Sequence, residues 1–428
     1  FTWIEFPKLT IMQPALTLSE QVIHARPGTG GRADAGSKRI ESIDIVRGIA
    51  MVIMALDHVR DYFHITANID DPLNLDTTNP LLFFTRWITH FCAPIFVFLS
   101  GTSIYLQSLR KTKKELSGFL IKRGLWLIFV ECVIIAFAWT FLPTLNVIPL
   151  QVIWAIGISM VLLGLIIHLP FKLILVLGLL IVFGHNLLDI PESAPGFKAG
   201  FWWDLFHHGY FTPYQYADKH IILMVYPFVA WTGVMMLGYC AGIFFTAAYT
   251  QQQRMKIIFR TGLLLIGLFV VVRFINIYGD PHPWQSQKTA LLSFFSFMKV
   301  QKYPPSLLYL CITIGPALLL LSFVEKIKNR FTNIMLVFGR TAFFYYILHL
   351  YLIHGLAVIS FFIKGHTVKE AMDSVQNLPF LFVLPGVGWG LGIVYGVWLA
   401  VIICLYPLCK WYDRYKTSHK EKWWLSYL

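Results

Sequence analysis

Residues 42–64 read SIDIVRGIAMVIMALDHVRDYFH, an apolar run that starts beside an Asp and an Arg and ends in a cluster of ionisable side chains. A helix needs about 20 mainly apolar residues to cross the roughly 30 Å of hydrocarbon in a bilayer. The stretch from Ile43 to Phe63 has that length. We therefore predict that it crosses a membrane and brings its last turns to an active site near the far surface.

The composition of the chain also indicates a membrane protein. Of its 428 residues, 57% are hydrophobic and 13% are charged, whereas soluble domains carry about 25% charged residues. Further segments resemble the first in length and apolar character, so we predict an all-α, polytopic bundle of about ten transmembrane helices. The expected segments are residues 43–63, 81–106, 119–142, 150–168, 171–189, 221–247, 257–278, 304–323, 334–362 and 388–412.

The distribution of basic residues predicts how this bundle is oriented in the membrane. With the N-terminus in the cytoplasm, most of the 35 Lys and Arg residues fall on the cytoplasmic side, as the positive-inside rule requires. An even number of helices then returns the C-terminus to the cytoplasm. Because topology accounts for the net charge of +13, we expect a lipid bilayer as partner and no nucleic acid. Residues 1–37 are predicted to be a mobile polar tail, and residues 38–428 the transmembrane domain.

The end of the first segment carries the strongest candidates for chemistry. Asp57, Asp61 and His64 stand at i, i+4 and i+7 and share one helix face, while His58 and Tyr62 share another. Charged groups at such depth usually face a bundle interior or a water-filled cavity. The simpler alternative is a charged helix end at the lipid headgroups.

Two cations in the second segment need partners. Arg86 and His90 lie one turn apart, shortly before Pro94, which should bend or weaken the helix. The carboxylates that close the first segment are the obvious partners, across a short loop. A purely structural salt bridge between the two helices is the alternative.

Other patterns are weaker. The stretch FWWDLFHHGYFTPYQY, residues 201–216, is rich in aromatic side chains, as are both carbohydrate-binding surfaces and membrane interfaces. The 14 histidines form no HxxxH or HExxH pattern, so we expect no metal.

Four motifs in a fixed order resemble a known family. They are RIESIDIVRGIAMVIMALDH (39–58), THFCAPIFVFLSGTSIYL (89–106), KYPPSLLYL (302–310) with GPALLLL (315–321), and FGRTAFFYYILHLYLIH (338–354). The chain is similar to bacterial members of the heparan-alpha-glucosaminide N-acetyltransferase catalytic-domain family, within the wider transmembrane acyltransferase superfamily. The resemblance implies transfer of an acetyl group from cytoplasmic acetyl-CoA to an amino sugar or glycan on the outer side of the membrane.

The resemblance matches the helix-one histidine of related acyltransferases to His58, and His64 is a second candidate. In the mechanism that we expect, His58 is the general base, since an imidazole with an unperturbed pKa near 6.5 suits that role at neutral pH. Asp57 or Asp61 would fix its tautomer. Arg86 or His90 would stabilise the thioester oxyanion. Direct transfer and an acetyl-histidine intermediate both remain open.

The resemblance also gives the cytoplasmic cations a role in binding the phosphates of CoA. Arg47 and Arg340 are favoured, because each stands beside a glycine that would let a ligand approach the backbone. Attraction to anionic lipid explains most of the set equally well. The residues assigned to acetyl-CoA are Arg47, Arg110, Lys111, Lys113, Lys114, Arg123, Arg340 and, in the ninth segment, His349.

Two other functions are open. A proton-coupled transporter would use the same outer carboxylates and histidines as a relay, and it predicts internal repeats, of which the two halves show no convincing sign. A membrane scaffold would explain the composition but not the cluster at the end of the first segment. We expect the cytoplasmic (inner) membrane of a bacterium as location, with a homodimer as an open alternative to a monomer.

Overall fold

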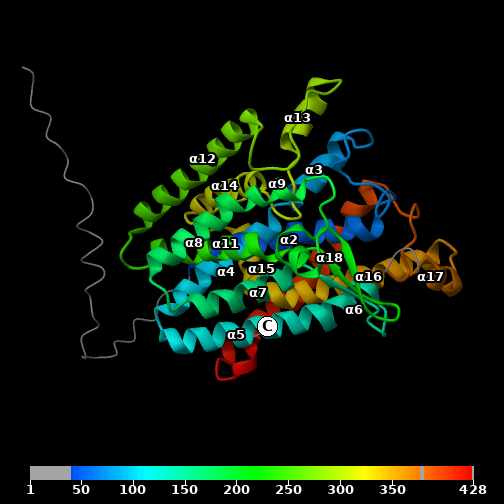
Figure 1. The fold of residues 1–428 in the computed structure, drawn as a ribbon. Helices are drawn as coiled ribbons and strands as arrows, with labels where there is room; N and C mark the ends of the chain where they lie inside the picture. Colours follow the sequence, from blue (N-terminus) through cyan, green and yellow to red (C-terminus); the bar gives the residue numbers. More distant parts are fainter. Residues whose placement is uncertain (1–39, 376–379, 427–428) are drawn as a thin grey trace, which may run out of the picture. The chain divides into compact units, whose positions relative to one another are not determined.

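The first helix lies in the middle of a helical bundle. The structure is a computed structural model and describes residues 40–375 and 380–426, so the expected tail, residues 1–37, lies outside the described part. Helix α2 (Glu41–Phe63) is buried along most of its length and packs against α4, α14, α15, α16 and α18 (Figure 1). The apolar run at residues 42–64 therefore forms the central helix of the bundle.

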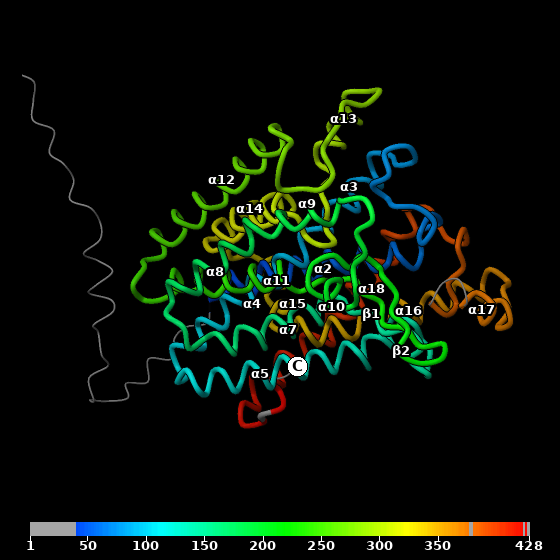
Figure 2. The backbone as a smooth tube through the Cα atoms, in the orientation of Figure 1, coloured from blue at the N-terminus to red at the C-terminus, as the bar shows by residue number. Residues whose placement is uncertain are grey.

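The other helices follow α2 in the chain, with short π or 3-10 turns between several of them, as the tube in Figure 2 traces. They are α3 (Pro80–Thr89), α4 (Cys92–Ser108), α5 (Lys113–Val130), the π-helix η1 (Glu131–Ile135), α6 (Ala136–Thr140), α7 (Val152–Ile166), α8 (Phe171–Gly184), η2 (His185–Leu188), α9 (Asp189–Glu192), α10 (Phe201–Trp203), η3 (Asp204–His208), α11 (Phe228–Ala241), η4 (Gly242–Phe245), α12 (Gln251–Ile275), α13 (Ala290–Met298), α14 (Leu307–Val324), α15 (Arg330–Arg340), α16 (Ala342–Ile363), α17 (Val368–Ser374), α18 (Leu391–Ser418) and η5 (Trp423–Ser426).

Seven helical stretches in the described chain are long and apolar enough to cross a membrane. They are Pro80–Ser108, Phe171–Glu192, Phe228–Phe245, Gln251–Ile275, Leu307–Val324, Ala342–Ile363 and Leu391–Ser418. The expected segments 43–63, 119–142 and 150–168 are also helical, but α2 and α5 carry several charges and α7 has 15 residues. The mostly helical fold is confirmed, and the count of about ten crossings stays a prediction.

A small sheet interrupts the helical pattern. Strand β1 (Val147–Leu150) runs parallel to β3 (His220–Met224), and β2 (Thr212–Ala217) pairs with the other edge of β3 in antiparallel register. The sequence prediction of a helix from residue 221 is therefore wrong at its start, because HIILM forms β3 and α11 begins at Phe228. A short apolar run rich in β-branched residues does not distinguish a strand from a buried helix.

The second crossing breaks where the sequence predicts a bend. Helix α3 ends at Thr89 and α4 begins at Cys92. Pro94 has no N–H, so the carbonyl of His90 loses its usual partner one turn ahead. The hydroxyl of Tyr309 donates to that carbonyl instead, at 2.7 Å. The break therefore keeps its backbone hydrogen-bonded inside an apolar bundle and fixes the position of His90.

Helices α2 and α15 touch at two glycines. A Cβ atom added to Gly48 would lie 1.8 Å from the carbonyl oxygen of Met335, and one on Gly339 would lie 1.7 Å from that of Asp44. The prediction that a ligand approaches the backbone at these glycines is wrong, since the other helix fills the space. The expected single helix 334–362 is wrong as well, because α15 and α16 are separated at Thr341.

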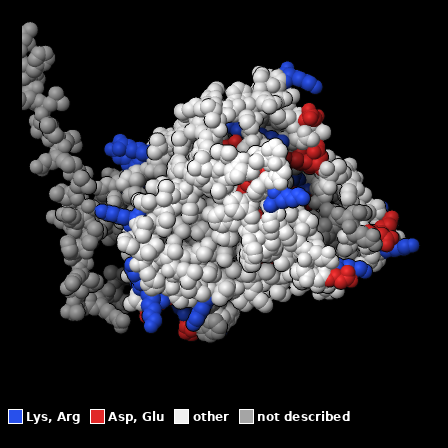
Figure 3. Space-filling model, in the orientation of Figure 1, with Lys and Arg blue, Asp and Glu red and all other residues white. Residues whose placement is uncertain are grey.

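The loops between the helices lie at the two ends of the bundle. At one end Lys113 donates to the carbonyl oxygens of His168 and Leu169 at 3.0 and 3.4 Å, and Arg254 pairs with Glu325. Figure 3 shows basic side chains along the left edge of the visible face, the side on which α5 begins in Figure 1. The loops that hold the ionisable end of α2 lie at the opposite end.

Candidate active site

Asp57 is the centre of a buried ionic cluster. The Nη1 atom of Arg86 lies 2.7 Å from both of its carboxylate oxygens, and the hydroxyl of Thr89 donates to Oδ1 at 2.9 Å. Arg60 Nη2 is 2.8 Å from Oδ1, and Lys302 Nζ is 4.0 Å from Oδ2. The expected pairing of Arg86 with a carboxylate of the first helix is confirmed. Three cations surround this carboxylate, so its position is tightly fixed.

Asp61 and His64 lie at the margin of this cluster. Asp61 pairs with Arg60 at 2.5 Å, and its side chain is 36% exposed. His64, just beyond the end of α2, accepts through Nδ1 from the backbone N–H of Thr66 at 3.3 Å. Burial and the nearby Arg60 lower the pKa of His64 below its ordinary value. Its contacts shape the turn after α2.

His58 forms a pair with His349. The Nδ1 atom of His58 lies 2.7 Å from Nε2 of His349, and the planes of the two rings are inclined by 16°. Nδ1 of His349 lies 3.0 Å from the carbonyl oxygen of Tyr345, which only accepts. His349 therefore carries its proton on Nδ1 and accepts through Nε2, so His58 donates from Nδ1 and keeps its Nε2 lone pair for chemistry.

This pair corrects the prediction that Asp57 or Asp61 fixes the tautomer of His58. The tautomer of His58 is fixed by His349, whereas Asp57 is engaged by Arg86 and Asp61 by Arg60. His349, expected among the residues that bind acetyl-CoA, lies against His58 instead of with the cytoplasmic cations, and its role in binding acetyl-CoA stays a prediction. Nothing within α2 could have indicated this contact, because the two histidines are 291 positions apart.

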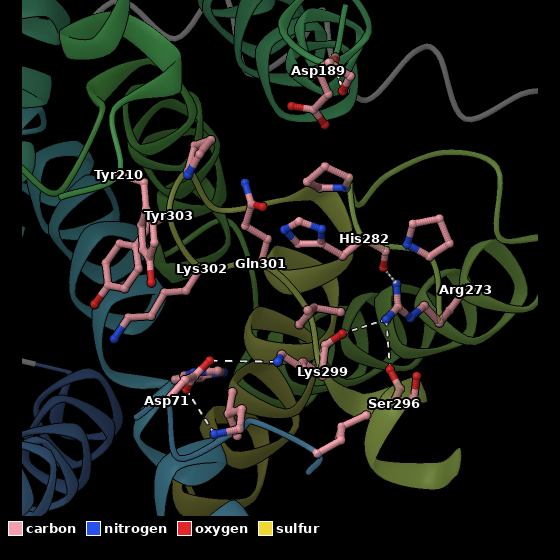
Figure 4. A pocket seen from close by; sticks show the side chains of 18 of the residues that line it. Asp71, Asp189, Tyr210, Arg273, His282, Ser296, Lys299, Gln301, Lys302 and Tyr303 are labelled. Carbon is pink, nitrogen blue, oxygen red and sulfur yellow. Dashed lines mark hydrogen bonds and ion pairs between the residues drawn. The ribbon is translucent and has the colours of Figure 1, made fainter. Parts of the chain in front are cut away.

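A cavity of about 830 Å³ opens beside the ionic cluster. Its lining includes Arg86, His90, Lys302, Tyr303 and Tyr210, and Figure 4 shows the last three together on one side of it. His90 lines the cavity, and within the described residues it has no carboxylate partner and no hydrogen bond to its buried Nδ1 atom. The expected pairing of His90 with a carboxylate is thus wrong.

Lys302 and Tyr303 are functional candidates that the sequence reasoning did not identify. Lys302 Nζ lies 5.0 Å from the centre of the Tyr303 ring. Burial alone would raise the pKa of the Tyr303 phenol, but Lys302 and Arg86 lower it below its ordinary value. Both residues stand in KYPPSLLYL, one of the four motifs that carry the family resemblance, but the motif assigns them no chemical role.

Arg273 holds the loop that carries Lys302 and Tyr303 in place. Arg273 donates to four backbone carbonyl oxygens, those of His282, Ser296, Phe297 and Lys299, at 2.6 to 3.0 Å (Figure 4). All of these bonds point to the backbone, so Arg273 is a structural clamp. It fixes the loop that leads to Lys302.

One group of side chains in the described chain has the spacing of metal ligands. Ligand atoms of Asp189, Glu192 and His207 lie within 4.8 Å of one another. Hydrogen bonds already occupy them, since His207 Nδ1 is 2.8 Å from Glu192, Trp203 donates to Glu192 at 2.8 Å, and Asn186 donates to Asp189 at 2.7 Å. These bonds account for the cluster, and the absence of a metal stays a prediction.

The residues assigned to acetyl-CoA lie at the other end of the bundle, His349 excepted. Arg47 contacts Asp44 and the hydroxyl of Ser103, each at 3.0 Å. Arg340 is 28% exposed and only loosely paired, with Glu41 at 3.8 Å and Asp413 at 3.7 Å. The remaining members lie at or after the α4–α5 connection, with Arg123 half-buried and the others exposed: Arg110, Lys111, Lys113, Lys114 and Arg123.

Comparison with known protein families gives a match. A family model described as "Heparan-alpha-glucosaminide N-acetyltransferase, catalytic" matches residues 39–275. No curated protein matches the chain. The matched range includes Asp57, His58, Arg86 and His90, while Lys302 and His349 lie beyond it.

Proposed function

The chain belongs to the heparan-alpha-glucosaminide N-acetyltransferase catalytic family, and we propose that it moves an acetyl group from cytoplasmic acetyl-CoA to an amino sugar or glycan on the outer side of a bacterial inner membrane. The family implies a membrane acetyltransferase with acetyl-CoA as co-substrate. The observation that carries the proposal is the buried His58–His349 pair, which leaves Nε2 of His58 available as a base. His58 directly follows Asp57, whose partners Arg86 and Lys302 line a large polar cavity.

The proposed topology has ten crossings and both termini in the cytoplasm. The ten expected segments correspond in order to α2, α3 with α4, α5 through α6, α7, α8, α11, α12, α14, α15 with α16, and α18. In that arrangement the contacts of Lys113 and Arg254 lie on the cytoplasmic side, and the cavity with Lys302 lies on the outer side. The distribution of basic residues supports this orientation.

In the proposed site, acetyl-CoA enters from the cytoplasmic end. Arg340 is the best candidate to hold its phosphates, because its ion pairs are long and no described residue hydrogen-bonds its Nε atom. Arg47 is engaged with Asp44 and Ser103, so we assign it a supporting role. Lys113 is occupied by two backbone carbonyl oxygens, and the other cations of this end agree equally with anchoring to anionic lipid.

The acceptor would bind in the outer cavity. Arg86, His90, Lys302 and Tyr303 present charged and polar groups there, and Tyr210 offers an aromatic face of the kind that stacks on sugar rings. His58 would take a proton from the acceptor amine or hydroxyl, and His349 would hold its ring. The oxyanion role of Arg86 or His90 stays a prediction, although Arg86 is already bound to Asp57 through Nη1.

The first test is calorimetric titration of acetyl-CoA into the purified full chain. We expect micromolar binding to the wild type and to His58→Ala, with affinity at least about tenfold lower in Arg340→Ala, since one charge-assisted phosphate contact is worth about 1.5–3 kcal/mol. Lys256→Ala is the matched control, because Lys256 is an exposed cation near the start of α12. If the wild type does not bind acetyl-CoA, the acetyltransferase is refuted and the proton-coupled transporter becomes the leading alternative.

A further inference from the structure

His354 is a buried histidine on α16 whose two ring nitrogens both face backbone carbonyl oxygens. Its exposed fraction is 0%. The Nδ1 atom lies 2.9 Å from the carbonyl oxygen of Ala138 in α6, and the Nε2 atom lies 2.8 Å from that of Leu381. The hydroxyl of Tyr62 is 3.4 Å from Nδ1, but it donates its proton to the carbonyl oxygen of Trp139. Nδ1 therefore has acceptors around it and no donor.

This geometry indicates how many protons the ring of His354 carries. A carbonyl oxygen only accepts hydrogen bonds, whereas a neutral imidazole has one N–H donor and one nitrogen that accepts. A neutral ring would place a nitrogen lone pair against one of the two carbonyl oxygens, at 2.8 or 2.9 Å. The imidazolium donates from both nitrogens. The observed contacts are therefore those of a doubly protonated, positively charged His354.

The surroundings of His354 favour this charge without locking it in place. The ring of Phe141 stacks on it, with centroids 3.7 Å apart and 12° between the planes, and an aromatic face attracts a cation. Phe141 presents its ring from a left-handed backbone with φ of 50°, which non-glycine residues rarely adopt. Within the described residues no charged side chain pairs with His354, and Tyr62 is the titratable side chain that contacts it. Because burial opposes an unpaired charge, the ring can lose a proton.

His354 fastens one end of the segment 380–389, which we call the strap. At this end the carbonyl of Leu381 accepts from His354, and the N–H of Leu381 donates to the carbonyl of Thr140 at 3.1 Å. At the other end the N–H of Trp389 donates to the carbonyl of Phe63 at 2.7 Å. The strap therefore connects the end of α6 with the end of α2. Half of the polar contacts that hold Leu381 come from His354.

The strap lies next to the aromatic side chains that enclose His58. The ring of Phe380 lies 5.9 Å from that of Trp139 and 6.0 Å from that of Tyr62. The Trp139 ring in turn lies 4.9 Å from His58, edge to face, and His58 is 9% exposed. A strap that is fastened at Leu381 therefore holds an aromatic layer against the candidate base.

We propose that His354 is a proton-operated latch, whose imidazolium fastens the strap at Leu381 and whose loss of the Nε2 proton releases that end. Loss of either proton would break one of the two contacts, because a deprotonated nitrogen repels a carbonyl oxygen. Ala138 belongs to a helix packed against α16, whereas Leu381 lies in a connection, so the strap is the part that yields. Histidine changes its charge between about pH 5 and 8. The strap should be fastened at low pH and released as the pH rises.

The first test reads the protonation of His354 directly in the full chain in lipid nanodiscs. The ¹⁵N NMR spectrum of protein labelled at histidine distinguishes an imidazolium from a neutral ring. Among the 14 histidines, His354 gives the signal that is missing from His354→Gln. We expect an imidazolium at about pH 5.5 and a neutral ring at about pH 8.5.

The second test measures how firmly the strap is held. Hydrogen exchange of the strap amides, followed by mass spectrometry, should be about tenfold or more faster in His354→Gln than in the wild type at about pH 5.5, because Gln donates from one nitrogen only and a charge-assisted hydrogen bond is lost. At about pH 8.5 the two proteins should exchange alike. His168→Gln is the matched control, since His168 is exposed after α7, and it should exchange like the wild type at both pH values.

Phe141→Leu gives a graded readout that a purely structural contact would not produce. It removes the aromatic face and neither carbonyl, so the imidazolium should lose its proton at a pH lower by about 0.5–1.5 units, and the strap should be released at that lower pH.

A neutral His354 at both pH values would overturn the latch, and so would equal exchange of the strap in the wild type and His354→Gln at about pH 5.5. If His354→Gln does not fold, the histidine signal that shifts in Phe141→Leu identifies His354, and its titration decides. Neither readout uses acetyl-CoA, so failure of the latch leaves the proposed acetyltransferase standing, and failure of the acetyltransferase leaves the latch to be tested.

Discussion

At the scale of single residues, the sequence identified half of a functional pair. His58 stands out because an ionisable side chain directly follows the apolar run MVIMAL. His349 supplies the contact that fixes its tautomer, from a helix far along the chain. Helical spacing reports only neighbours on the same helix, so a partner on another helix remains hidden.

The contact between His58 and His349 predicts that two substitutions of His349 lower activity by different amounts. The Gln side chain can still accept from His58 Nδ1 through its amide oxygen, whereas Leu cannot. We expect His349→Leu to lower kcat by about 10²-fold or more, toward the loss in His58→Ala, since positioned general bases contribute about 10²–10⁴-fold. His349→Gln should recover much of that loss. The rate of thiol release from acetyl-CoA measures the activity of each variant. Equal activity of the Leu and Gln variants would contradict a positioning role.

At the scale of elements, most helices were predictable and their interruptions were not. Long apolar runs predicted the helices, and Pro94 predicted the break between α3 and α4 because its missing N–H acts locally. The break at Thr341 carries no proline, and strand β3 is stabilised by pairing with β1 and β2, which lie outside its own sequence. Such features depend on tertiary contacts, which a scan along one segment does not detect.

The crossing of α2 and α15 gives a prediction about stability. Gly48→Ala and Gly339→Ala would each place a methyl group inside backbone atoms of the facing helix. Overpacking typically costs 1–3 kcal/mol, occasionally more, and backbone atoms cannot rotate away. We expect a clear loss of thermal stability in detergent for both. Gly355→Ala on α16 is the control, because no atom lies within 4 Å of its added Cβ, and it should unfold at or above the wild-type temperature. A wild-type melting curve for both crossing variants would contradict the close contact.

At the scale of the whole molecule, the two groups of candidate functional residues lie at different ends of the bundle. The cations assigned to acetyl-CoA cluster at one end of the bundle, and the ionic cluster around Asp57 and the cavity lie at the other. Between them runs α2, with Arg47 near its first turns and His58 near its last. Under the proposed function, acetyl-CoA held by the cations at one end would have to reach along this helix to His58 at the other. The proposed acetyl transfer across the membrane requires such a division, and composition alone could not reveal it.

The separation predicts which surfaces are accessible from outside the cell membrane. Lys288 lies in the exposed loop before α13 at the cavity end, and Lys114 is exposed near the start of α5. In cells with a permeabilised outer membrane, a membrane-impermeant maleimide should label Lys288→Cys at once and Lys114→Cys only after lysis. The native cysteines lie within helices, so the wild type is the background control. Labelling of Lys114→Cys alone in intact cells would invert the topology, and the acetyl donor would then have to bind at the cavity end.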